Sequence, residues 1–177
     1  MLEPIYLREF ITPEQEISLL SLATKESNKG GKERNNFQRW GKPLPYSSNF
    51  KSSKIPDEIL NINLFFDYDS VSMNEYYEGQ NLDYHFDLPQ SGNKIYILSL
   101  LNEGYLSFKR KDEEFKVLLE PRSICVLQDE LRWVWKHSAI SSKERYSIVF
   151  RNSTDIITCQ HLCTKCDSYH YKKECNS

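Results

Sequence analysis

Apolar and polar positions alternate along the chain in a pattern that predicts helices near the start and strands after them. Residues 6–10 form a short aromatic and apolar run that predicts a strand. Thr12 precedes Pro13, which predicts a helix with Thr12 as its N-cap that runs to about residue 24. A second helix is predicted over residues 56–66, where apolar residues recur at helical spacing.

From residue 71 onward the pattern changes to short alternating or apolar runs separated by glycine and proline. The predicted strands cover residues 71–76, 82–86, 94–101, 105–109, 114–119, 123–127 and 146–151. Several short strands at this spacing are typical of a sandwich or jelly roll. We therefore expect a mainly β fold with one or two flanking helices packed outside, an α+β arrangement.

Composition supports one β-rich domain. The 177 residues include 9 Phe and 11 Tyr, and these side chains suit a pleated surface better than a helix face. A chain of this length can bury about 70% of the surface that its unfolded state exposes, so a core forms without disulfides. No apolar run approaches the roughly 20 residues needed to span a bilayer, and charges interrupt residues 1–10. We expect a monomeric intracellular protein, cytoplasmic or nuclear, with no membrane contact.

Charge is unevenly distributed along the chain. Residues 25–54 carry a net charge of +6, whereas the remaining residues sum to −8. Aromatic residues, Phe37 and Trp40 among them, are interleaved with cations such as Arg39. Cations that pair with phosphates and rings that stack on bases are typical of a nucleic-acid surface. The alternative is an ordinary solvated basic loop.

Two segments offer ligands for a metal ion. His85 and Asp87 are two residues apart, so in an extended segment both side chains lie on one face. His137 follows far downstream. Two histidines and one carboxylate form the facial triad of non-haem Fe(II) oxygenases. Each residue could instead be part of a packed core or an ordinary surface.

The run from Arg145 to Arg151 predicts a strand with an unusual polar face. Alternation places Arg145, Ser147 and Arg151 on one side. Two arginines on a buried face require anions, and guanidinium groups bind carboxylates through two parallel hydrogen bonds. The alternative is an exposed cationic face.

The ordered combination of these motifs resembles a known family. The motifs are Asn74-x-Tyr76, His85-x-Asp87, Ser99-Leu100, His137 and Arg145-x-Ser147-x-x-x-Arg151. Together they resemble the AlkB family of Fe(II)- and 2-oxoglutarate-dependent dioxygenases, whose core is a double-stranded β-helix, or jelly roll. The resemblance covers about residues 6–151 and shares features with the homologue-6 and homologue-8 branches of eukaryotes. One departure is Leu101, which stands where the family has a glycine.

The resemblance implies roles for individual residues. Residues 1–157 would form the dioxygenase domain, with His85, Asp87 and His137 as the Fe(II) ligands. A second set would bind 2-oxoglutarate: Arg145 would pair with its distal carboxylate, helped by Tyr76 and Ser147, while Asn74 and Arg151 would surround its metal-proximal end.

The resemblance also implies a reaction and a substrate class. Oxidative decarboxylation of 2-oxoglutarate to succinate would drive hydroxylation or demethylation of a nucleic-acid base, with RNA, and tRNA especially, favoured over DNA. Residues 25–54 align with the family's nucleotide-recognition lid, in which Phe37, Arg39 and Trp40 would contact the substrate. The alternative for the two aromatic rings is to close the outer core. Alternative functions are a protein- or small-molecule-directed oxygenase, and a nucleic-acid-binding relative without turnover.

Residues 158–177 form a cysteine-rich tail. Cys159, Cys163, Cys166 and Cys175 provide four soft ligands, the number that a structural zinc ion requires. The alternative is an unpaired tail. Cys125, within an apolar run, is expected to be a small buried residue.

Overall fold

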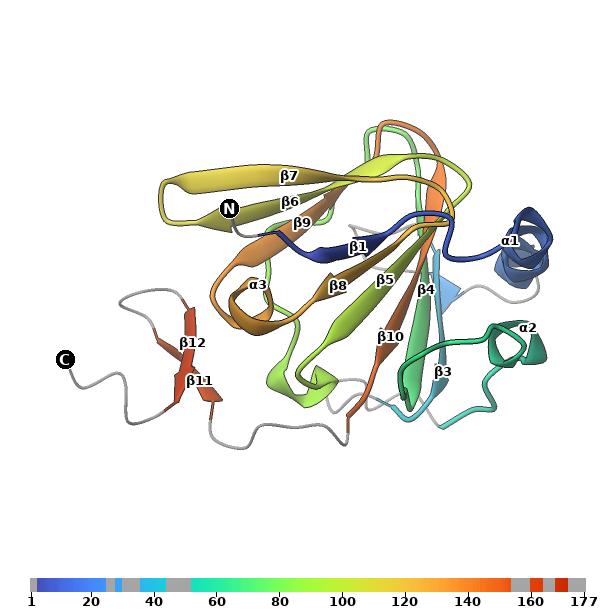
Figure 1. Ribbon diagram of the computed structural model, residues 1–177, viewed down its shortest axis with the longest axis horizontal. Coiled ribbons are helices and arrows are strands. Elements are labelled where there is room, and N and C mark those ends of the chain that lie inside the picture. The colour runs from blue at the N-terminus through green and yellow to red at the C-terminus, as the bar shows by residue number, and fades with distance from the viewer. Residues whose placement is uncertain are drawn as a thin grey trace.

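Two antiparallel β-sheets face each other, and helices cover the outer face of the larger one (Figure 1). The computed structural model describes residues 3–24, 28–29, 36–43, 52–153, 160–163 and 168–171. Segments that are far apart in the sequence become neighbours in both sheets, because the chain crosses repeatedly from one sheet to the other.

The larger sheet has seven strands in the order β1-β8-β5-β10-β4-β3-β2. Their bounds are β1 Ile5–Leu7, β2 Asn28–Lys29, β3 Asn36–Gly41, β4 Ser70–Tyr76, β5 Ile95–Leu100, β8 Ile124–Leu127 and β10 Arg145–Arg151. Strand β10 is central, with β4 on one side and β5 on the other. The predicted strands at 71–76, 94–101, 123–127 and 146–151 are therefore confirmed, with small shifts of their ends, whereas the strand predicted at 6–10 begins at Ile5 and ends already at Leu7.

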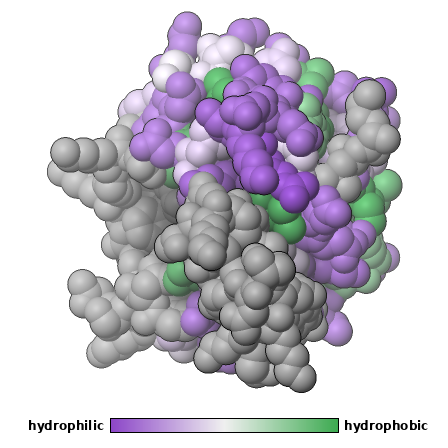
Figure 2. Space-filling model, turned by 90° about the vertical axis from the view of Figure 1, so that its left-hand side faces the viewer, coloured by the Kyte–Doolittle hydropathy of each residue, from purple (hydrophilic) through white to green (hydrophobic). Residues whose placement is uncertain are grey.

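The smaller sheet has the order β7-β6-β9, with β6 at Gly104–Arg110, β7 at Glu113–Leu119 and β9 at Lys136–Ile140. The β6–β7 hairpin extends beyond the sandwich, and the described part of this end of the molecule is mainly hydrophilic (Figure 2). In the tail, β11 at Gln160–Cys163 pairs with β12 at Ser168–Tyr171 in a separate sheet.

Alternating side chains of the sheets build two apolar clusters. One lies between the sheets and includes Ile97, Phe108 and Val149. The other lies between the larger sheet and the helices and includes Ile148 and Phe150. Neighbours along β10 therefore enter different clusters, as the period of two in a strand requires.

The first helix begins as predicted. Helix α1 spans Pro13–Leu20, and a 3-10 turn at Ser21–Thr24 continues it. The Thr12 side chain accepts a hydrogen bond from the Gln15 backbone N–H, and the Gln15 side chain accepts one from the Thr12 backbone N–H. This capping box satisfies two N–H groups that have no partner within the helix.

The second predicted helix, over residues 56–66, is largely wrong. Helix α2 covers only Asp57–Leu60. Beyond it, Phe66 stacks on Tyr96 of the larger sheet with ring centroids 3.6 Å apart. Aromatic packing onto the sheet has overridden the helical periodicity of this segment.

The predicted strand at 82–86 is also wrong in its regularity. This segment joins β9 only through isolated bridges, Asn81 to Ile140 and His85 to His137. A 3-10 turn at Pro89–Ser91 follows it, and the short helix α3 at Asp129–Trp133 precedes β9. Within the described ranges, no helix combines the length and apolar character needed to cross a membrane.

Candidate active site

A polar cavity lies between the two sheets. It encloses about 470 Å³, including the part that is open to solvent. Its polar lining comes from β4, β9, β10 and the segment before the 3-10 turn: Asn74, Tyr76, His85, Asp87, His137, Arg145, Ser147 and Arg151. Leu82, Ile97, Leu106 and Leu119 provide much of its apolar wall.

The polar face of β10 points into this cavity. Arg145, Ser147, Val149 and Arg151 all line it, whereas Ile148 and Phe150 lie in the helix-side cluster. The predicted alternation of this strand is confirmed. Both arginines are buried, so the alternative of an exposed cationic face is wrong.

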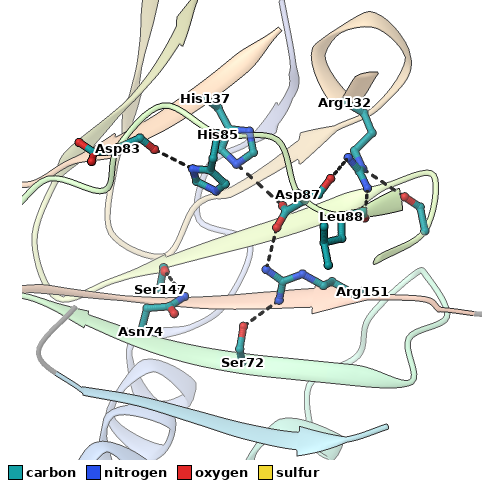
Figure 3. Close-up of polar contacts among 11 residues, drawn as sticks. Ser72, Asn74, Asp83, His85, Asp87, Leu88, Arg132, His137, Ser147 and Arg151 are labelled. Carbon is teal, nitrogen blue, oxygen red and sulfur yellow. Dashed lines mark hydrogen bonds and ion pairs between the residues drawn. The ribbon is translucent and has the colours of Figure 1, made fainter. Parts of the chain in front are cut away.

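His85, Asp87 and His137 lie together at one side of the cavity (Figure 3). Two backbone hydrogen bonds join His85 to His137, with N···O distances of 3.0 and 2.9 Å. The imidazole centroids are 4.4 Å apart, and His137 Nε2 is 3.8 Å from Asp87 Oδ2. Tertiary structure therefore brings the distant histidine beside the local pair.

The orientation of His85 leaves one ring nitrogen available. Its Nδ1 lies 2.7 Å from the backbone oxygen of Asp83. A carbonyl oxygen can only accept, so Nδ1 carries the proton and donates. The Nε2 lone pair is then free, and metal-binding histidines in proteins are commonly fixed in this way.

Arginine charge keeps the partly buried Asp87 carboxylate ionised. Burial alone would raise the pKa of Asp87, but nearby cations, Arg151 foremost, hold that pKa below its ordinary value. The Arg151 Nη2 is 3.3 Å from Asp87 Oδ1, and its Nη1 donates to Ser72 Oγ at 2.8 Å.

The second histidine is held neutral. The pKa of His137 is lowered to about 3, mainly by burial and secondly by the neighbouring His85. A neutral imidazole and an ionised carboxylate are the forms that bind a metal ion.

The donor types of this cluster fit iron, although the side chains are neighbours rather than assembled ligands. Among the described residues, no three His, Cys, Asp or Glu side chains are arranged to hold a metal ion as they stand. The Asp87 carboxylate is instead directed to Arg151. Two imidazoles and one carboxylate remain the donor set of a non-haem Fe(II) site.

Arg145 lies elsewhere in the cavity and has no anionic partner in the part of the chain that the structure describes. It is only 1% exposed, its Nη2 donates to Ser99 Oγ at 2.8 Å, and its guanidinium lies 5.5 Å from the centre of the Tyr76 ring. Its Nε has no hydrogen-bond partner, and no carboxylate of the described residues forms an ion pair with it. Beside it, Asn74 Nδ2 donates to Ser147 Oγ at 3.3 Å. A buried, unpaired cation beside hydroxyl and amide groups is suited to a carboxylate ligand.

Arg39 and Trp40, two of the predicted substrate residues, are neighbours on β3, so their side chains lie on opposite faces of the sheet. Trp40 packs against the helix-side cluster and does not line the cavity, which corresponds to the outer-core alternative. In the backbone register of β3 against β4, Arg39 lies opposite Ser72, and Phe37 lies opposite Asn74, which lines the cavity. Residues 25–27, 30–35 and 44–51, which carry four of the eight cations of the 25–54 segment, lie outside the described residues.

Three of the four predicted zinc ligands lie outside the described residues. Cys163 is the last residue of β11, whereas Cys159, Cys166 and Cys175 lie outside the described residues. The zinc site therefore stays a prediction. Cys125 is fully buried in the cluster between the sheets, as expected.

Sequence reasoning missed Arg132 of helix α3. It is 2% exposed and donates from Nη1 to the backbone oxygen of Asp87 at 2.9 Å. The signal that could have revealed it is an arginine enclosed by Leu131, Trp133 and Val134, since a charged residue inside an apolar run is placed for burial.

Comparisons with known proteins agree on the fold. No family model matches the chain. An uncharacterized protein of Acanthamoeba polyphaga mimivirus is 28% identical, with 82% of each chain covered. The solved structure of OsALKBH1 is similar at a TM-score of 0.64 and 15% identity, covering 86% of this chain and 99% of that chain. A Pseudomonas putida prolyl-4-hydroxylase is similar at a TM-score of 0.57 and 17% identity, covering 85% and 92%.

These similarities define the architecture. The protein has an α+β double-stranded β-helix, or jelly-roll, fold with flanking helices, as predicted. At this level of identity the comparisons do not assign a branch within a family, so the homologue-6 and homologue-8 features stay predictions.

Proposed function

We propose that this protein is an Fe(II)- and 2-oxoglutarate-dependent oxygenase. One observation carries the proposal: a single jelly-roll cavity contains both an imidazole–carboxylate cluster and a buried arginine that has no anionic partner among the described residues. The two features match the two things that such an enzyme binds, a metal ion and a dicarboxylate.

The cavity residues would bind the metal ion and the cosubstrate separately. His85, Asp87 and His137 would hold Fe(II), which when bound supplies the oxidative chemistry with dioxygen and 2-oxoglutarate. Arg145 would pair with the distal carboxylate of 2-oxoglutarate, because its guanidinium is already buried and desolvated. Tyr76 would flank that carboxylate from the position of its ring beside Arg145.

The remaining cavity residues would orient the cosubstrate and exclude water. Asn74 and Ser147 are hydrogen bonded to each other and would present polar atoms along its length. Arg151 bridges Ser72 and Asp87, so it would set the charge around the metal-proximal end. Leu106 and Leu119 of the smaller sheet line the same cavity and would help to exclude water from it.

The first prediction tests turnover. Purified protein with Fe(II) should convert 2-oxoglutarate to succinate, and His85→Ala, Asp87→Ala and His137→Ala should each abolish the conversion. Removal of one of three protein ligands leaves the metal without its coordination geometry. Succinate is measured by mass spectrometry or NMR.

Asp83→Ala is the matched control, because Asp83 contributes only its backbone oxygen to His85 and its side chain is exposed. Succinate formation should persist in this variant. Normal succinate formation by Asp87→Ala would show that Asp87 is not an Fe(II) ligand.

For the substrate, we propose a nucleic-acid base, in RNA and tRNA rather than DNA. Support comes from the similarity to OsALKBH1 and from the +6 charge of residues 25–54. The second candidate is a protein- or small-molecule-directed oxygenase, favoured by the similarity to a prolyl-4-hydroxylase at a comparable TM-score. Nucleoside mass spectrometry of RNA and DNA treated with protein, Fe(II) and 2-oxoglutarate distinguishes the two, since loss of a modified nucleoside supports only the first. A relative without turnover would bind nucleic acid and form no succinate.

A further inference from the structure

Arg132 joins α3 to the backbone that carries Asp87. Its three guanidinium nitrogens donate to three carbonyl oxygens: Nη1 to Asp87 at 2.9 Å, Nη2 to Leu88 at 2.7 Å and Nε to Gly92 at 3.1 Å (Figure 3). The guanidinium carbon also lies 4.1 Å from the centre of the Trp133 ring. Ring and carbonyls together define the position of the guanidinium group.

The segment held by Arg132, residues 87–92, lies outside the strands of both sheets, and the Asp87 side chain within it also pairs with Arg151. Asp87 belongs to no strand, and the last bridge before it is His85 to His137. After Asp87 the chain makes a 3-10 turn and reaches Gly92, whose φ is +91°. A Cβ at Gly92 would collide with the Asn152 backbone oxygen, so the end of the turn is confined between Asn152 and Arg132.

Arg132 also lies close in the chain to the second histidine. Helix α3 ends at Trp133 and β9, which carries His137, begins at Lys136. The side chain of Arg132 thus connects the segment that carries the carboxylate to the element that leads into His137. A shift of Asp87 relative to the two histidines would require breaking these contacts.

We propose that Arg132 is a positioning residue that sets the place of the Asp87 carboxylate relative to His85 and His137. The inference rests on the proposed function, since it assumes that these three residues bind a metal ion. Arginine suits the role because its planar fork holds three acceptors in one geometry, which the single ammonium group of lysine cannot reproduce. Loss of a group that orients a metal ligand typically weakens metal binding by about 10- to 100-fold.

The test is a titration of the metal-free protein with Co(II), followed by visible absorption, in the absence of 2-oxoglutarate. Arg132→Met should weaken Co(II) binding by about 10- to 100-fold, and Arg132→Lys should fall between this variant and the wild type. In an Asp87→Asn background, adding Arg132→Met should weaken Co(II) binding by less than about threefold relative to Asp87→Asn alone. The reason is that a residue that acts through Asp87 has little further effect once Asp87 is changed. Should Arg132→Met fail to fold, Arg132→Lys carries the comparison in both backgrounds.

Arg122→Met is the matched control. Arg122 pairs with Glu16 of α1 and lines no part of the cavity, so its loss should lower stability without changing Co(II) affinity. Unchanged Co(II) binding by folded Arg132 variants, or an equal loss in the Asp87→Asn background, would overturn the inference. If His137→Ala binds Co(II) as tightly as the wild type does, the proposed function itself is overturned.

Discussion

At the scale of single residues, Gly104 provides the space in which Arg145 lies. A Cβ added at Gly104 would lie 2.7 Å from Arg145 Cδ, 2.9 Å from its Nε and 3.0 Å from the Ile140 backbone oxygen. The carbonyl is part of the smaller sheet, so the arginine would have to move. Glycine is required here by close approach, not by its backbone conformation.

Gly104→Ala should therefore displace Arg145 and weaken 2-oxoglutarate binding. We expect the KM for 2-oxoglutarate to rise by on the order of 10- to 100-fold, with a smaller change in kcat, since a misplaced binding group is costly even at a shift of about 1 Å. Succinate formation as a function of 2-oxoglutarate concentration measures this effect.

Gly79→Ala is the comparison for this prediction. Its φ of +75° makes alanine strained, but no atom lies within 4 Å of the added Cβ. It should lose stability and keep its KM. An unaltered KM in Gly104→Ala would show that the distal carboxylate does not bind at Arg145.

At the scale of elements, one buried carboxylate fastens α1 to two turns of the sheet. Glu16 accepts hydrogen bonds from the Leu101 backbone N–H at 2.8 Å and from Arg122 Nη1 at 3.1 Å. Both partners have left-handed backbones, with φ of +74° at Leu101 and +61° at Arg122. Leu101 occupies the place where the AlkB-like pattern has glycine, and Glu16 supports its strained conformation.

Glu16→Ala should destabilise the fold by about 1–3 kcal/mol, because it leaves a partly buried backbone N–H and a half-buried guanidinium without their acceptor. Equilibrium urea unfolding gives the free energy of unfolding. Glu14 lies in the same first turn of α1 but is exposed, so Glu14→Ala should change that free energy by less than about 0.5 kcal/mol. Equal effects of the two substitutions would exclude this role for Glu16.

At the scale of the whole molecule, the larger sheet separates the cavity from the core that packs against the helices. One face carries the cavity, and the other packs against α1, α2 and the aromatic segment that follows α2 (Figure 1). Trp40 belongs to the second face. Its replacement by alanine would therefore affect packing first, and base recognition would depend on other residues of the 25–54 segment.

The last prediction concerns that segment as a nucleic-acid surface. Affinity for single-stranded RNA or tRNA should fall steeply as salt rises, since each neutralised phosphate releases counterions. Replacing Lys25, Lys29, Lys32 and Arg34 with glutamine should flatten the slope of log Kd against log salt by about 3 to 4 if all four contact phosphates. Fluorescence anisotropy at several salt concentrations measures the slope.

The control replaces four exposed lysines elsewhere, Lys94, Lys111, Lys116 and Lys143, with glutamine. These substitutions should leave the slope nearly unchanged, although they remove the same formal charge. Equal slopes for both sets, or binding that ignores salt, would favour a protein or small-molecule substrate.

Much of the fold and site followed from local sequence patterns. Alternation alone placed Arg145, Ser147 and Arg151 on one face of β10, because strand side chains change sides at every residue. Capping chemistry alone placed the start of α1 at Thr12 and Pro13. Such inferences succeed because their causes lie within a few residues of each other.

Other features were decided only by tertiary structure. The side of the sheet on which Trp40 lies depends on the register of β3 against β4, and α2 ends early because Phe66 stacks on Tyr96 of a distant strand. Arg132 reaches the Asp87 carbonyl across 45 positions of sequence. The reason is physical: a hydrogen bond or ring contact between remote segments depends on where the whole chain brings them, and no local periodicity records that distance.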